Sequence, residues 1–240
     1  MPRFFHEVPS GDSLIINGPD AQHIRRALRM QPGEHLTVCD GQGTDYACQI
    51  AAFEGEGVRL SVLSHAPNCT EPSLAVTLYQ GLPKGDKMDW ILQKAVELGV
   101  TAVVPLATSR SVVRLDGKEE KKRERWQRIA AEAAGQCGRG IVPRVESPLS
   151  FAQALPLLQR DKTICFYEGG GQPLSRLVDA GEARLSIVIG PEGGFAEEEI
   201  AALRSAGAAV ATLGPRILRC ETAPLAALTL LMHLTGNLDA

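Results

Sequence analysis

The sequence lacks several features that would place it in common classes of protein. Its six cysteines include no C-x-x-C pair, which argues against a structural zinc site and favours free thiols in a reducing compartment. No apolar run reaches about 18 residues, and no basic segment followed by an apolar one opens the chain. We therefore expect a soluble cytoplasmic protein without a membrane span, a leader or a metal.

The chain also lacks an excess of positive charge. Its formal net charge is −3, which excludes a uniformly basic surface for nucleic acid. The charge is unevenly spread, because residues 81–145 hold 13 lysines and arginines against 8 acidic residues, whereas residues 1–70 hold 5 against 8. Any surface that binds nucleic acid must therefore be a local patch.

The C-terminal part of the chain predicts two strand–loop–helix units in succession. An apolar run at 185–189 ends at the loop Gly-Pro-Glu-Gly-Gly at 190–194, and apolar positions at helical spacing follow at 195–207. Two such units in tandem favour parallel strands with crossover helices, and so an α/β fold. The second of these strand–loop–helix units comprises a strand at 208–214, a charged loop at 215–222 and an almost wholly apolar helix at 223–236.

The two loops are the candidate binding site, because parallel sheets bind ligands beyond the carboxyl ends of their strands. In the first loop, Gly190, Gly193 and Gly194 allow main-chain groups to approach a flat ring. This loop matches neither G-x-G-x-x-G nor a Walker A sequence, and no acidic residue follows about 20 positions later. A phosphate cradle and a nucleotide-dependent oxidoreductase are therefore weaker alternatives. The second loop carries Arg216, Arg219, Glu221 and Thr222.

The N-terminal part predicts a small β-barrel. A helix at 21–30 carries Arg25 and Arg29, four residues apart and so on one helix face. This pair either contacts phosphates or stacks on bases of a nucleic acid, or forms a solvated face. Glycine turns separate the short alternating runs of the barrel, at 13–18, 35–41, 46–53 and 58–65.

The loop at 66–73 is the expected domain boundary. A buried strand at 74–81 begins a second sheet. Basic residues near the ends of the loops in this part of the chain either bind a nucleic-acid backbone or only keep the edge of the sheet hydrated. These residues are Lys84, Lys87, Arg110 and Arg114, with Arg139 at the end of a long helix. Other expected elements are helices at 88–99 and 116–140 and strands at 101–106 and 163–168.

Three segments carry a resemblance to a known family. IGPEGGF at 189–195, LGPRILRCETAP at 213–224 and KGDKMDWILQKAVELGV at 84–100 resemble the RsmE family of 16S rRNA uracil-N(3)-methyltransferases, members of the SPOUT superfamily. The resemblance covers nearly the whole chain, including residues 22–41. One departure is Gly135, a position at which relatives commonly carry Glu.

The resemblance implies a PUA-like RNA-binding β-barrel at 1–70 and a SPOUT α/β domain at 74–240, with a deep trefoil knot over about 163–236. It implies a homodimer with the site at the subunit interface, and S-adenosylmethionine as the cofactor. The implied reaction is methylation of N(3) of a specific uridine in the 16S rRNA of the small (30S) ribosomal subunit. The alternative is a non-catalytic dimeric RNA-binding protein of the same fold.

The resemblance and the loop pattern together assign residues to roles. We expect RNA contacts at Arg25, Arg29, Lys84, Lys87, Arg110 and Arg139. We expect cofactor contacts at Tyr167, Glu168, Ile189, Gly190, Gly193, Leu213, Gly214, Ile217, Leu218, Arg219 and Thr222.

A positive group is needed to stabilise the uracil anion, and Arg219 is the first candidate, with Arg216 the second. An ion pair of Arg219 with Glu221 or Glu192 would instead only fix the loop. The proton acceptor is water or Glu221, which is equally suited to capping the last helix.

Two other side chains of this region have competing interpretations. His233 lies in the apolar helix and is expected to be a core histidine. Cys220 adjoins Arg219, which would lower the pKa of its thiol and permit a covalent route, whereas simple packing explains this cysteine equally well. The helix at 223–236 is apolar all round, which predicts burial in a core or against a second subunit.

Overall fold

The computed structural model describes residues 1–7, 11–112 and 117–239. The chain divides into two compact units, the first comprising Met1–Glu71 with Ala134–Val142 and the second comprising Pro72–Ala133 with Pro143–Ala240. None of the described helices is long and apolar enough to cross a membrane.

The first unit contains a curled sheet of five strands in the order β1-β3-β4-β5-β2. Neighbouring strands are antiparallel except β1 and β3, and two register shifts between β4 and β5 bend the long central hairpin. Ile16, Leu36, Ile50 and Leu60 are fully buried between the curled faces. The strands are β1 (Arg3–Phe5), β2 (Ser13–Ile16), β3 (His35–Cys39), β4 (Thr44–Glu54) and β5 (Gly57–Pro67).

The predicted helix at 21–30 begins and ends three residues earlier than expected. α1 (Gly18–Gln22) runs into a single π-helical turn, η1 (His23–Ala27), and Arg29 lies beyond it with a left-handed φ of 53°. The main-chain N–H of Met30 donates to the carbonyl of Ile24 at 3.1 Å, which closes the helix end. The prediction that Arg25 and Arg29 share one helix face is therefore wrong.

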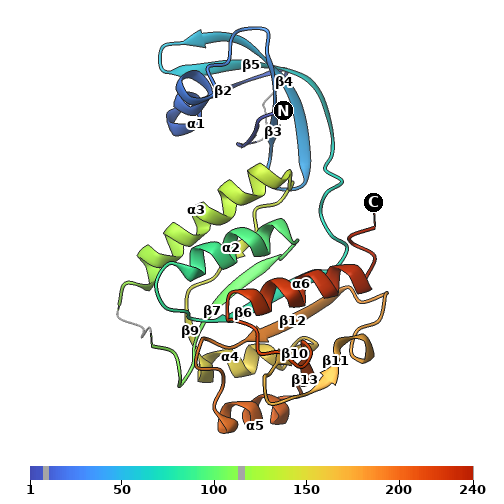
Figure 1. Ribbon diagram of the computed structural model, residues 1–240. Helices are drawn as coiled ribbons and strands as arrows, with labels where there is room; N and C mark the ends of the chain where they lie inside the picture. Colours follow the sequence, from blue (N-terminus) through green and yellow to red (C-terminus); the bar gives the residue numbers. More distant parts are fainter. Residues whose placement is uncertain (8–10, 113–116, 240) are drawn as a thin grey trace. The chain divides into compact units, whose positions relative to one another are not determined.

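The second unit is built on a sheet whose paired strands are all parallel, in the order β11-β13-β10-β12-β6-β7-β8, with β9 also paired to β7. α4 and α5 cover the face that carries Tyr79, Cys165 and Val188, and α2 and α6 lie on the other side of the sheet (Figure 1). The predicted α/β class with a parallel sheet is confirmed.

The predicted strands and helices of this unit lie within three residues of their expected bounds, and the structure adds elements at 144–145, 149–150, 151–158 and 172–173 that were not predicted. The strands are β6 (Ala75–Gly81), β7 (Ala102–Ala107), β8 (Arg144–Val145), β9 (Leu149–Ser150), β10 (Thr163–Phe166), β11 (Gln172–Pro173), β12 (Arg184–Ile189) and β13 (Ala209–Thr212). The helices are α2 (Lys87–Glu97), α3 (Glu119–Cys137), α4 (Phe151–Leu158), the 3-10 turn η2 (Leu174–Arg176), α5 (Glu197–Ser205) and α6 (Thr222–Leu234).

α6 is apolar all round, yet only one of its sides is buried. Ala227, Leu228 and Leu231 face the protein interior, while Leu230 is 41% exposed. His233 lies on the exposed side, so the expectation of a core histidine is wrong.

The segment 134–142 joins the first unit through polar contacts that the sequence did not predict. Arg139 is only 5% exposed, and its guanidinium pairs with the carboxylate of Glu71 at 2.6 Å. The same carboxylate accepts hydrogen bonds from the main-chain N–H groups of Gly140 and Ile141, at 2.9 and 3.0 Å. Arg139 therefore stabilises this unit, and its predicted contact with RNA finds no support in this geometry.

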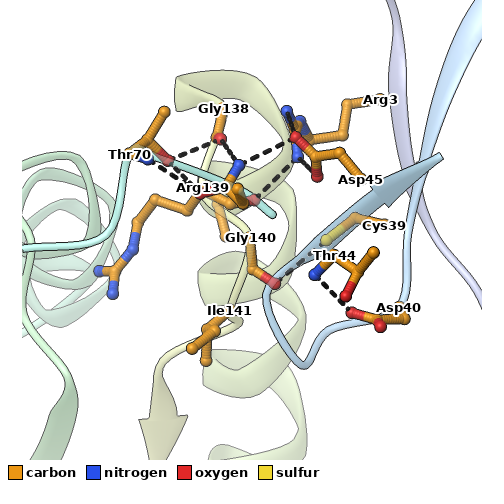
Figure 2. Close-up of polar contacts among 12 residues, drawn as sticks. Arg3, Cys39, Asp40, Thr44, Asp45, Thr70, Gly138, Arg139, Gly140 and Ile141 are labelled. Atoms are coloured by element: carbon orange, nitrogen blue, oxygen red, sulfur yellow. Dashed lines mark hydrogen bonds and ion pairs between the residues drawn. The ribbon is translucent and has the colours of Figure 1, made fainter. Parts of the chain in front are cut away.

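A second set of contacts holds the same segment (Figure 2). The thiol of Cys39 donates to the carbonyl of Gly140 at 3.1 Å. Arg3 forms a bidentate ion pair with Asp45, at 2.5 and 2.7 Å, and the side-chain amide of Asn68 donates to Asp45 at 3.0 Å. These groups bring strands β1, β3 and β4 into one polar network.

We predict that Arg139→Met lowers the free energy of unfolding of the first unit by about 3 kcal/mol, because it leaves a largely buried carboxylate without its cation. Arg59→Met is the matched control, since the Arg59–Glu54 pair has side chains 50% and 39% exposed and should contribute less than about 1 kcal/mol. Urea denaturation of both variants measures the difference, and equal effects would contradict the structural role of Arg139.

Candidate functional site

A cavity of about 580 Å³ lies at the carboxyl ends of β10, β12 and β13. This volume is typical of pockets that bind small molecules, and its place beyond parallel strands is the one that ligands occupy in such sheets. The lining is Phe166, Tyr167, Glu168, Ile189, Gly190, Pro191, Glu192, Gly193, Gly194, Thr212, Leu213, Gly214, Pro215, Arg216, Ile217, Leu218, Arg219, Cys220 and Ala223.

The glycine loop after β12 is held close to two other segments. A Cβ at Gly193 would lie 3.0 Å from the Cβ of Arg110, and the Arg110 guanidinium donates to the Gly193 carbonyl at 3.1 Å. Gly194 has a φ of +64°, and a Cβ there would overlap the carboxylate of Glu168. These glycines are thus required by the approach of neighbouring protein segments, in addition to the approach of a ligand that the sequence suggested.

The second loop presents its arginines to solvent. Arg216 and Arg219 are exposed, and among the described residues neither side chain has an ion-pair partner. Glu192 and Glu221 pair with Lys87 instead, so the alternative that Arg219 is neutralised by one of these glutamates is wrong. The Arg219 guanidinium is therefore available to a ligand.

Lys87, at the start of α2, contacts both loops. Its ammonium lies 2.8 Å from Glu192 Oε1 and 3.4 Å from Glu221 Oε2, and the main-chain N–H of Lys84 also donates to Glu192 at 3.1 Å. The hydrogen bond to Glu192 raises the pKa of Lys87. Burial acts to raise the pKa of Glu192, but the hydrogen bond from Lys87 and further main-chain donors lower it overall.

Cys220 and Glu221 are directly coupled. The thiol donates to Glu221 Oε2 at 3.1 Å, and burial, followed by this contact, raises the pKa of Cys220 to about 12. The suggestion that Arg219 lowers the pKa of this thiol is therefore wrong. The hydrogen bond from Cys220, with the further effect of Lys87, lowers the pKa of Glu221. Cys220 is thus a poor nucleophile and Glu221 a weak base.

Most residues predicted to contact a cofactor surround this cavity. Thr222 is the exception, because it begins α6 and is absent from the lining. The sequence reasoning did not select Glu192, although a lone carboxylate inside a glycine-rich loop was a visible signal. The predicted residues that line the cavity are Tyr167, Glu168, Ile189, Gly190, Gly193, Leu213, Gly214, Ile217, Leu218 and Arg219.

The predicted RNA-contact residues are found in different settings. Lys84 is exposed, and Arg114 lies outside the described residues. Arg25 donates to the carbonyl of Gly55 at 2.6 Å and lies 4.8 Å from the centre of the Phe53 ring. Arg25 therefore links η1 to the β4–β5 hairpin.

Comparisons with known proteins agree with this arrangement. An RNA methyltransferase domain model matches residues 70–232, and an RNA methyltransferase PUA domain model matches residues 16–63. The chain therefore belongs to the RNA methyltransferase family that these models describe.

Individual relatives carry more specific names. "Ribosomal RNA small subunit methyltransferase E" of Bacillus subtilis is 39% identical, covering 98% of this chain and 97% of the relative. The crystal structure of a protein of that name from Neisseria gonorrhoeae, bound to S-adenosyl methionine, is 32% identical with a TM-score of 0.90, covering 98% of both chains. A putative methyltransferase from Legionella pneumophila, in complex with the bound cofactor SAM, is 31% identical with a TM-score of 0.88, covering 96% of both.

Proposed function

We propose that this protein is an S-adenosylmethionine-dependent methyltransferase that modifies N(3) of a uridine in the 16S rRNA of the small ribosomal subunit. The main observation behind this proposal is the cavity at the carboxyl ends of β10, β12 and β13, with Arg219, which forms no ion pair with any described residue, on its wall. Similarity over nearly the whole chain to rRNA small subunit methyltransferases supports the substrate class.

The cavity fits the proposed cofactor in chemistry as well as in size. Ile189, Leu213 and Leu218 supply apolar surface for a flat adenine ring, and the exposed carboxylate of Glu168 stands at the wall for the ligand's polar groups. When bound, S-adenosylmethionine supplies a methyl group already activated by its sulfonium. The protein must then hold the uracil in line and keep water away from the reacting atoms.

Arg219 is the proposed catalytic residue. Uracil N(3) becomes a nucleophile only when its proton leaves, and a guanidinium near the ring oxygens stabilises the resulting anion by about 2.7–4 kcal/mol. Arg216, three residues earlier in the same exposed loop, is the second candidate.

We propose that water, rather than a side chain of the protein, accepts the proton that leaves uracil N(3). The pKa of Glu221 is lowered by the hydrogen bond from Cys220 and then by Lys87, and a carboxylate so stabilised takes up a proton poorly at neutral pH. His233 is exposed near the other end of α6, three turns from Glu221.

We further propose that the N-terminal part of the first unit, about residues 1–70, binds RNA in the manner of a PUA domain. Arg29 is exposed, and Arg25 stands over the Phe53 ring, so both offer guanidinium groups to phosphates. In the second unit, the exposed Lys84 and Arg110 adjoin the glycine loop. A ribosomal substrate implies action in the cytoplasm.

Assembly and chain threading are part of the same proposal. The half-buried Ala226 and the exposed Leu230 on the outer side of α6 favour a homodimer, since a second subunit would remove this apolar surface from water. We also propose a knot over about 163–236, in keeping with a chain in which residues 212–220 line the same cavity as the segments after β10 and β12 before α6 packs against α2.

We predict that the protein binds S-adenosylmethionine with micromolar affinity in calorimetric titration and that Gly193→Val abolishes binding. The added side chain would clash with Arg110, whose Cβ would lie 3.0 Å from the new Cβ. Gly181→Val is the matched control, because its Cβ would meet no atom within 4 Å. Intact RNA binding with no cofactor binding by the wild type would favour a non-catalytic RNA-binding protein.

We also predict that Arg219→Ala lowers kcat by about 10²–10³ at saturating cofactor, since one transition-state donor is lost. Methyl transfer to small ribosomal subunits measures the rate. Arg204→Ala, an exposed arginine on α5, removes the same charge and should leave the rate within about twofold. A normal kcat in the Arg219 variant would exclude this residue from catalysis.

A further inference from the structure

A single ammonium group connects three segments of the second unit. Lys87 begins α2, Glu192 lies inside the glycine loop, and Glu221 ends the loop that carries Arg219. The Lys87 ammonium contacts both carboxylates, at 2.8 and 3.4 Å. Glu192 and Glu221 each lie more than 100 positions from Lys87 in the chain. This shared ion pair is therefore a long-range contact that links the two loops on either side of the cavity.

The three side chains that form these ion pairs are only partly accessible to water. The side chains of Lys87, Glu192 and Glu221 are 33%, 26% and 26% exposed. Among the described residues, no other lysine or arginine side chain forms an ion pair with either carboxylate, although the main-chain N–H of Lys84 donates to Glu192 at 3.1 Å. Lys87 is thus the one described cationic side chain that the two carboxylates share, and it offsets the negative charge of both, with Cys220 as a neighbouring neutral thiol.

The two carboxylates belong to the segments that shape the cavity. Glu192 is flanked by Pro191 and Gly193, and Glu221 stands two residues after Arg219. The main-chain carbonyl of Arg219 accepts bonds from Thr222 and Ala223, at 2.9 Å each, so Arg219 and the start of α6 form one turn. A displacement of Glu221 would therefore move Arg219 as well.

We propose that Lys87 is a positioning residue of the cofactor site, rather than an RNA contact, and that it sets the separation of the two loops through Glu192 and Glu221. The inference rests on the proposed function. A simple exposed ion pair would contribute little to stability and nothing to ligand affinity, so the two explanations predict different outcomes.

The test compares Lys87→Met with Lys94→Met by calorimetric titration with S-adenosylmethionine. Lys94 is on the same helix and pairs with Glu97 at 2.7 Å, away from both loops, so its variant loses the same charge and the same kind of contact. We expect the Lys87 variant to bind the cofactor at least tenfold more weakly, and the Lys94 variant to bind within twofold of the wild type.

Two further variants separate positioning from general destabilisation. Lys87→Arg keeps the cation and should restore affinity to within a few-fold of the wild type. Adding Glu221→Gln to Lys87→Met removes the repulsion between the carboxylates and should tighten binding relative to Lys87→Met alone. Should Lys87→Met fail to fold, Glu192→Gln removes the ion pair between residues 87 and 192 and should weaken cofactor binding.

The outcomes distinguish this inference from the proposed function. A wild type that binds no cofactor would overturn both. Normal cofactor affinity in Lys87→Met, with reduced affinity for ribosomal RNA, would overturn the positioning role and return Lys87 to the RNA surface. Equal loss of affinity in the Lys87 and Lys94 variants would also overturn it.

Discussion

The parallel pairing of β12 between β10 and β6 is the constraint on which the site depends. Because parallel strands end at one edge of a sheet, this pairing brings the glycine loop beside residues 166–168 and beside the end of β6. The loop after β13 completes the cavity from the next position in the sheet. No single segment of the chain could form this cavity, and its shape follows from strand order.

The basic side chains discussed above fall into two groups. Some pair with carboxylates inside the fold, and others are exposed to solvent. Arg139 and Lys87 are engaged by carboxylates, with Arg139 almost fully buried. Arg216 and Arg219 have no ion-pair partner in the described part of the chain and stand at the cavity. Since a cation without an ion-pair partner on a pocket wall suits an anionic ligand or transition state, this contrast supports the proposal that Arg219 and Arg216 are the catalytic candidates.

Local patterns in the sequence predicted the elements well and the long-range contacts poorly. Apolar runs and glycine stops located β12, α5 and α6 within a few residues, because hydrophobic periodicity is a local property. The Lys87–Glu192 pair and the attachment of 134–142 to the first unit join residues far apart in the chain, and no spacing rule encodes them. The exposure of His233 was missed for the same reason, since apolar composition does not tell which side of a helix is covered.

The most direct test is mass spectrometry of nucleosides from unmodified small ribosomal subunits incubated with the protein and S-adenosylmethionine. If the cavity serves methyl transfer to a uracil N(3), 3-methyluridine should form in 16S rRNA and be absent without the cofactor. Methylation at a pyrimidine carbon or a ribose oxygen would contradict the proposed chemistry. No methylation by a protein that binds both the cofactor and the subunit would contradict the assignment as an enzyme of rRNA.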